Sequence, residues 1–199
     1  MQRSLKFFLA LGLVVCFSGS LWATPIEWNG HWYEAVYASP VQTWTQANAA
    51  AQAANGYLAT STSSAENSFL YSLISNSTYW ELVGGGSTWG PWLGGYRSNG
   101  EWKWVTGETW SYTNWAATEP GPDENYIHFY TNHNYGTFTP GDTWNNLGDV
   151  DYHVHGFIIE WDYNPANGPI NNPVPLPSTV LLLGSGLLGL AGWRKLRKG

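Results

Sequence analysis

Two unbroken apolar runs, one near each end of the chain, enclose a middle part in which apolar and polar positions alternate over short distances. The runs cover residues 7–17 and 179–193. The middle part, residues 24–162, has the length of one ordinary domain and is rich in Trp, Tyr and Gly. Glycine-rich turns between aromatic residues are typical of short strands joined by long loops, and the pattern therefore argues against a helical bundle.

Two helices are predicted in the first half of this middle part. The alanine-rich run 43–54 contains no Pro or Gly, begins at Thr43 as a possible N-cap and stops at Asn55-Gly56, residues that favour a helix end. Ser63 and Glu66 then have the spacing of a capping box. The apolar residues that follow fall on one face of a second helix: Phe69, Leu70, Leu73 and Ile74.

The strand-like stretches are His31–Tyr37, Trp92–Tyr96, Tyr126–Tyr130 and Gly156–Trp161. The last is mostly apolar, which predicts a central strand. Together with the two helices, these strands predict an α+β fold class.

Residues 1–23 have the pattern of a secretory signal peptide, with a basic start, an apolar run and a small-residue exit. We predict cleavage after Ala23, which would also remove Cys16 and leave a cysteine-free protein. An uncleaved anchor is the alternative, although the apolar run is short for a membrane span.

The C-terminal segment, residues 174–199, has three parts in a fixed order: Val174-Pro175-Leu176-Pro177-Ser178, the apolar run Thr179–Trp193 and a basic tail. This order resembles the PEP-CTERM sorting signal of Gram-negative bacteria in its Val-Pro-Leu-Pro form. The resemblance implies transient insertion of 179–193 as a short transmembrane segment, recognition by an exosortase, removal of the tail and delivery to the cell surface or extracellular matrix. An ordinary tail anchor is the alternative. Residues 163–173, rich in Asn, Pro and Gly, read as the linker before the signal.

Charge is distributed unevenly along the chain. Arg97 and Lys103 are the only basic residues in the middle part, against all fourteen acidic residues, so its formal charge is −12. Such a surface repels phosphate backbones, which argues against a nucleic-acid partner.

A succession of motifs in residues 24–162 resembles the C-type lectin family. The two-helix half is carried by Trp44 with Ala47, Asn55-Gly56-Tyr57-Leu58-Ala59, and Ser63-Ser64-Ala65-Glu66-Asn67 with Phe69-Leu70. The second half is carried by Trp92-Leu93-Gly94-Gly95, Trp102-Lys103-Trp104 with Gly107, Tyr112-Thr113-Asn114-Trp115, Glu119-Pro120, Trp144-Asn145 and Phe157-Ile158-Ile159-Glu160. The resemblance implies a C-type lectin-like fold, with two helices flanking small antiparallel sheets and a long irregular loop region.

Both disulfides of the family are missing. The positions that match the first are Ala51 and Ile159, and those near the second are Tyr126 and Asp149. Loss of a native disulfide typically costs about 2–5 kcal/mol. We therefore expect apolar packing to replace the bridge between Ala51 and Ile159.

The resemblance implies a calcium site in the long loop, because calcium takes about 6–8 oxygen ligands and can leave room for sugar hydroxyls. By motif, the metal ligands would be Glu119, Glu124, Asn145 and Asn146, with Asp123 or Asp149 as possible additions. Two family ligands are replaced, since Gly121 stands where an asparagine belongs and Asn146 where an aspartate belongs. The sequence therefore predicts weak calcium binding at most.

The same resemblance implies a sugar-binding role for Glu119, Glu124 and Asn145, with Trp115 and Trp144 as aromatic rings that could lie against a sugar. We therefore predict an exported, carbohydrate-binding, non-enzymatic protein whose partner is a glycan or exopolysaccharide. One alternative is a structural or adhesive matrix protein that uses the same fold for protein contacts without calcium or sugar. A glycosidase built on Glu119 and Glu124 is a further alternative, which their closeness within one loop disfavours. His153 and His155 alternate on a possible strand and would make at most half a zinc site.

Overall fold

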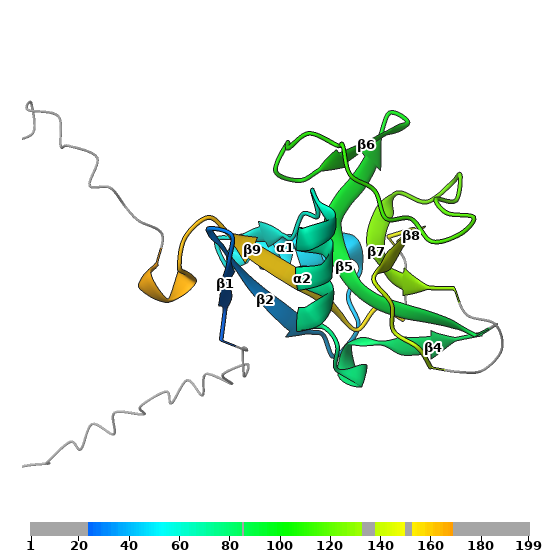
Figure 1. Cartoon of the computed structure of the whole chain (residues 1–199), viewed down its shortest axis with the longest axis horizontal. Coiled ribbons are helices and arrows are strands. Elements are labelled where there is room, and N and C mark those ends of the chain that lie inside the picture. The colour runs from blue at the N-terminus through cyan, green and yellow to red at the C-terminus, as the bar shows by residue number, and fades with distance from the viewer. Residues whose placement is uncertain (1–23, 85, 133–137, 150–152, 169–199) are drawn as a thin grey trace, which may run out of the picture.

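A computed structural model describes residues 24–84, 86–132, 138–149 and 153–168 (Figure 1). The predicted signal peptide, the end of the predicted linker, the apolar segment 179–193 and the basic tail lie outside these residues. No helix in the part of the chain that the structure describes has both the length and the apolar character needed to cross a membrane.

The described residues form two α-helices, nine strands and two short 3-10 helices. In chain order they are β1 Ile26–Trp28, β2 His31–Tyr37, α1 Trp44–Ala53, β3 Tyr57–Leu58, α2 Ser64–Leu73, η1 Ser77–Tyr79, β4 Glu81–Val83, β5 Ser87–Ser98, β6 Glu101–Trp104, β7 Tyr126–Thr131, β8 Thr143–Leu147, β9 Gly156–Trp161 and η2 Pro165–Asn167. The predicted α+β class is confirmed.

Both helices begin where the sequence predicts. Thr43 caps α1 in a full capping box with Gln46. Ser63 caps α2 by accepting the backbone N–H of Glu66 (3.2 Å), but the Glu66 carboxylate does not complete the box. This buried carboxylate accepts instead from the backbone N–H and the hydroxyl of Thr62 (2.7 and 2.8 Å).

The strands form one sheet in the order β1-β2-β9-β5-β7-β8, with β3 added to β9 and with β4 and β6 added to β5. Strand β9 lies between β2 and β5, and all six of its residues are buried, as its apolar run predicts. Strand β5 is longer than the predicted Trp92–Tyr96, since it begins at Ser87 and continues through Gly90 and Pro91. Pairing is antiparallel except at the single contact between β5 and β9.

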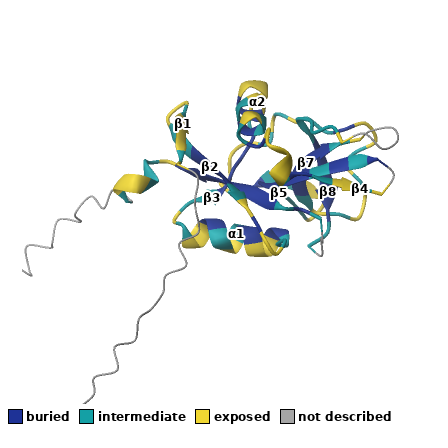
Figure 2. Cartoon of the chain, turned by 90° about the horizontal axis from the view of Figure 1, so that it is seen from below, coloured by how far each residue is buried: buried dark blue, intermediate teal, exposed yellow. Residues whose placement is uncertain are grey.

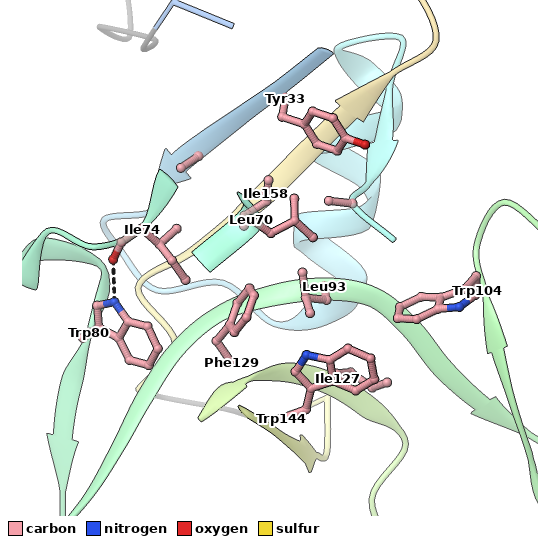
Figure 3. Close-up of a cluster of buried hydrophobic side chains, with 12 residues drawn as sticks. Tyr33, Leu70, Ile74, Trp80, Leu93, Trp104, Ile127, Phe129, Trp144 and Ile158 are labelled. Atoms are coloured by element: carbon pink, nitrogen blue, oxygen red, sulfur yellow. Dashed lines mark hydrogen bonds between the residues drawn. The ribbon is translucent and has the colours of Figure 1, made fainter. Parts of the chain in front are cut away.

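The two helices cover opposite faces of the sheet (Figure 2). On the α2 face, Leu70 and Ile74 pack with Leu93, Phe129 and the rest of an aromatic-rich cluster (Figure 3). On the α1 face the fully buried side chains include Ala47, Ala51, Leu58, Trp92 and Ile159. Two cores thus support one sheet, and both contain buried tryptophan.

Glycines in the Trp92–Gly95 motif let neighbouring strands approach closely. A Cβ atom on Gly94 would overlap the backbone carbonyl of Leu58, and one on Gly95 would overlap the side chain of Ile127. The motif is therefore required for packing.

Other contacts occupy both positions where the family carries disulfides. Ala51 and Ile159 are each fully buried in the same apolar cluster, in agreement with the expected packing. Tyr126 stacks on Trp44 at a centroid distance of 4.5 Å, and Asp149 Oδ1 accepts the backbone N–H of Thr45 at 2.8 Å. Both residues thus hold the first turn of α1 without a covalent bond.

Candidate functional site

The candidate site lies in the loop between β6 and β7, residues 105–125, where this loop meets β8. Its far part is fixed by the backbone, because Ala116 N–H donates to Trp144 O (2.9 Å) and Trp144 N–H donates to Asn114 O (2.8 Å). At its tip, Arg97 Nη1 donates to the carbonyl of Pro122 (2.6 Å). The loop is therefore attached to β8 on one side and to β5 on the other.

Glu119, Glu124 and Asn146 converge around Gly121. A methyl group placed on Gly121 would lie 3.4 Å from Glu124 Oε2 and 3.8 Å from both Glu119 Oε2 and Asn146 Oδ1. Three of the four predicted principal ligands are thus brought to one place. The replacement of an asparagine by Gly121 leaves space between them.

The side chain of Asn146 is completely buried and makes three hydrogen bonds to the loop. Its Nδ2 donates to the carbonyls of Gly121 (3.0 Å) and Glu124 (2.8 Å), and its Oδ1 accepts the N–H of Gly121 (2.7 Å). A flipped amide would set its oxygen against two carbonyl oxygens, so the hydrogen-bond partners fix its orientation. Both amide hydrogens are used on the loop backbone.

Glu119 sits in an unusual stretch of backbone. Burial raises the pKa of its carboxyl group, and the N–H of Gly121 offsets part of this rise. Thr118 has φ of 74°, a conformation that strains a β-branched residue, and Glu119-Pro120 is a cis peptide bond. The strain at Thr118, next to a half-buried carboxylate, is a feature that binding loops often show.

Asn145 does not join this group. Neighbouring side chains in a strand point to opposite faces of the sheet, and Asn145 faces His128 of β7 while Asn146 faces the loop. Its Nδ2 lies 3.1 Å from His128 Nε2 across the β7–β8 pair, where both residues are buried. Burial lowers the pKa of His128 to about 3, so the ring is neutral at pH 7 and can accept this hydrogen bond.

The two possible additional ligands lie elsewhere. Asp123 is exposed at the tip of the loop. Asp149 holds the start of α1 through Thr45, where a carboxylate also interacts favourably with the helix dipole.

The two tryptophans predicted to contact sugar differ in exposure. Trp144 is fully buried and donates its indole N–H to Asn67 Oδ1 (2.7 Å), so its ring belongs to the core. Trp115 is half-buried and lies 4.9 Å from the ring of Trp102. Of these two tryptophans, Trp115 is therefore the one whose ring remains partly open to solvent within the loop.

This group of residues fits a calcium ion only in part. Calcium takes about 6–8 oxygens at about 2.3–2.6 Å, and Glu119 and Glu124 can supply carboxylate oxygens. Asn146, however, directs N–H groups at the two carbonyls that would otherwise complete the ligand set. In residues 24–84, 86–132, 138–149 and 153–168, no cluster of at least three His, Cys, Asp or Glu side chains has an arrangement suited to a metal ion.

His153 and His155 are engaged by a third residue that the sequence did not single out. Glu81 in β4 contacts both, with Oε1 2.9 Å from His153 Nδ1 and Oε2 2.5 Å from His155 Nε2. Burial acts to raise the pKa of Glu81, but the hydrogen bonds from the two histidines and their charges together outweigh it, and the pKa is lowered. The pair therefore ties the edge strand β4 to the segment before β9.

Comparison with known proteins supports two parts of this description. The model of the PEP-CTERM protein-sorting motif matches residues 173–198, and such a motif marks an exported protein that is sorted at the cell envelope. No curated protein sequence matches the chain.

Among solved structures, SPL-1 in complex with GlcNAc is similar with a TM-score of 0.55 and 22% identity over 75% of this chain and 96% of that one. The cow CD23 carbohydrate-recognition domain, solved with a GlcNAc2Man3 oligosaccharide, gives a TM-score of 0.52 and 20% identity over 69% of this chain and 92% of that one. A calcium-independent type II antifreeze protein gives a TM-score of 0.50 and 19% identity over 70% of this chain and 92% of that one. The described part of the chain therefore has the C-type lectin-like fold, and residues 173–198 form a PEP-CTERM protein-sorting motif.

Proposed function

We propose that this exported protein binds a neutral glycan at the loop that carries Glu119 and Glu124. The observation that carries the proposal is the convergence of these two carboxylates with Asn146 around Gly121. Carboxylates that face one space can accept hydrogen bonds from neighbouring sugar hydroxyls, and charge-assisted bonds of this kind are strong. Trp115, a half-buried residue of the same loop, adds a partly open aromatic ring. The formal charge of −12 in the middle of the chain disfavours an anionic polymer.

The place of action in this proposal is the cell surface or the extracellular matrix, with an exosortase removing the C-terminal tail. Strand β1 and the residues that follow β9 lie at one end of the domain, whereas β6 and β8 beside the loop lie at the other (Figure 1). The loop therefore lies at the end of the domain away from the last described residues. Mass spectrometry of the surface-extracted protein should find a C-terminus close to Pro173, and recovery of the intact tail from extracellular material would contradict this processing.

We propose calcium as a cofactor that this loop binds weakly. The two carboxylates favour it, and the amide hydrogens of Asn146 oppose it. We expect a dissociation constant of about 1 mM or weaker, at the weak end of extracellular calcium modules.

Glycan binding should depend strongly on the two carboxylates. Glu119→Gln and Glu124→Gln should each weaken binding at least ~10-fold, because a hydrogen bond to a charged group contributes about 1.5–3 kcal/mol. A glycan array followed by calorimetry with the purified protein, in calcium and in chelator, measures both the sugar and the contribution of calcium. Glu101→Gln is the matched control, since Glu101 is 75% exposed and its carboxylate pairs with Lys103 inside β6 and not with a residue of the site.

Each part of the proposal has a result that would contradict it. Equal glycan affinity in calcium and in chelator would exclude calcium as a cofactor while leaving the sugar site in place. A blank array would contradict glycan binding and would favour the adhesive alternative, in which the same surface contacts a protein. Hydrolysis of a bound glycan would favour the glycosidase alternative.

A further inference from the structure

The Asn146 side chain ties together two backbone carbonyls of the loop. Its Nδ2 group donates to the carbonyl oxygens of Gly121 and Glu124, at 3.0 and 2.8 Å, and carbonyl oxygens are groups of the kind that a calcium ion also binds. The same side chain accepts the N–H of Gly121 at 2.7 Å and is fully buried. A buried amide whose two hydrogens and oxygen all find partners holds the backbone firmly, since breaking any one bond leaves a buried polar group unpaired.

We infer that the Asn146 amide replaces the ion as the element that shapes the loop, so that the loop keeps its conformation without calcium. The inference concerns the same loop as the proposed function and deepens it. It says that the carboxylates of Glu119 and Glu124 are positioned for a ligand by the protein itself.

Asn146→Asp would remove both N–H donors of the amide and would place a third carboxylate beside Glu119 and Glu124. Without a cation, three like charges and two unpaired carbonyls repel one another. With calcium, the three carboxylates and the carbonyls of Gly121 and Glu124 supply oxygen ligands of the kind that calcium prefers. One amide-to-carboxylate change should thus turn an ion-independent loop into an ion-dependent one.

The test is thermal unfolding of the purified protein in about 5 mM calcium and in chelator, for the wild type and for Asn146→Asp. We expect the wild-type midpoint to change by no more than ~3 °C, as weak binding implies. Asn146→Asp should unfold at least ~5 °C lower than the wild type in chelator, recover in calcium, and bind calcium at least ~10-fold more tightly. Asn125→Asp is the matched control, because it adds the same charge at an exposed position next to Glu124 and should give neither effect.

Hydrogen exchange of the Gly121 amide tests the inference on the wild type, even if Asn146→Asp fails to fold. This N–H should be protected equally in calcium and in chelator, and it should exchange faster in Asn146→Ala, where only the Glu119 carboxylate remains as an acceptor. Protection that appears only in calcium would overturn the inference, as would a wild-type midpoint that falls by ~10 °C or more in chelator. The test contains no glycan, so its failure is separate from a failure of the proposed sugar binding.

Discussion

Replacing Trp144 with alanine is expected to lower the free energy of unfolding by about 3–5 kcal/mol, the range for removing a buried large aromatic side chain. Trp144 is completely buried in β8. Its ring makes edge-on contacts with Trp104, Tyr112 and Trp115 at centroid distances of 5.8, 5.6 and 5.7 Å. Alanine would leave a cavity at the point where β8, the long loop and α2 meet. Urea unfolding followed by circular dichroism measures the loss.

Two further variants separate the packing of Trp144 from a direct role in binding. Trp144→Phe keeps most of the ring but loses the N–H that donates to Asn67 Oδ1, and should cost only about 1–2 kcal/mol. It should also keep the glycan affinity, since the ring does not reach solvent. Trp115→Ala should cost less stability than Trp144→Ala, because Trp115 is half-buried, and should weaken glycan binding more. Normal stability of Trp144→Ala with lost glycan binding would contradict the structural role assigned to Trp144.

The sequence predicts the parts of the fold that have strong local signals. The caps at Thr43 and Ser63 mark the two helices, and the apolar run of β9 marks the central strand. Strands β1, β3 and β4 are two or three residues long, too short for alternation to be read. The first half of β5 is hidden by Gly90 and Pro91, which ordinarily signal a turn.

At the candidate site, the sequence does not give the direction in which neighbouring side chains point. The motif groups Glu119, Glu124, Asn145 and Asn146, whereas the structure brings only three of them together around Gly121. The motif cannot show that Asn145 and Asn146 belong to a strand and so point to opposite faces. His128, the partner of Asn145, carried a usable signal, since it is a polar residue between Ile127 and Phe129 in a run that otherwise reads as a buried strand. What decides each role is the pairing of β7 with β8, which is a long-range contact.

Glu160 is a second residue whose role only the fold reveals, because β9 buries it within a network of polar groups. Its Oε2 accepts the backbone N–H of Thr60 at 3.0 Å, and its Oε1 lies 3.1 Å from the hydroxyl of Tyr57 and 3.3 Å from that of Tyr33. The Tyr33 hydroxyl also lies 3.0 Å from Glu66 Oε1. One hydroxyl hydrogen cannot serve two carboxylates at once, which favours a proton on one of them.

Burial raises the pKa of Glu160 from 4.5 to about 7, and the nearby charge of Glu66 adds to the rise. Hydrogen bonds from Thr60 and Tyr57 and the charge of His31 act in the opposite direction and lower this pKa. Because the folded pKa lies above the unfolded one, the folded state binds more protons between these two values, and its stability falls as pH rises through this window. The contribution present below pH 4.5 and lost above pH 7 amounts to about 3 kcal/mol.

Glu160→Gln should remove this pH dependence, since glutamine keeps a neutral side chain of the same shape at every pH. The free energy of unfolding of the variant should therefore rise relative to that of the wild type by about 3 kcal/mol between acid pH and about pH 8. Urea unfolding at a series of pH values measures the difference, which cancels the contributions of titrating groups that do not interact with Glu160. Glu101→Gln, at a site that is 75% exposed, should stay within about 0.5 kcal/mol of the wild type across the series. Parallel pH profiles for the wild type and Glu160→Gln would show that Glu160 is ionised in the folded protein, which would contradict the raised pKa.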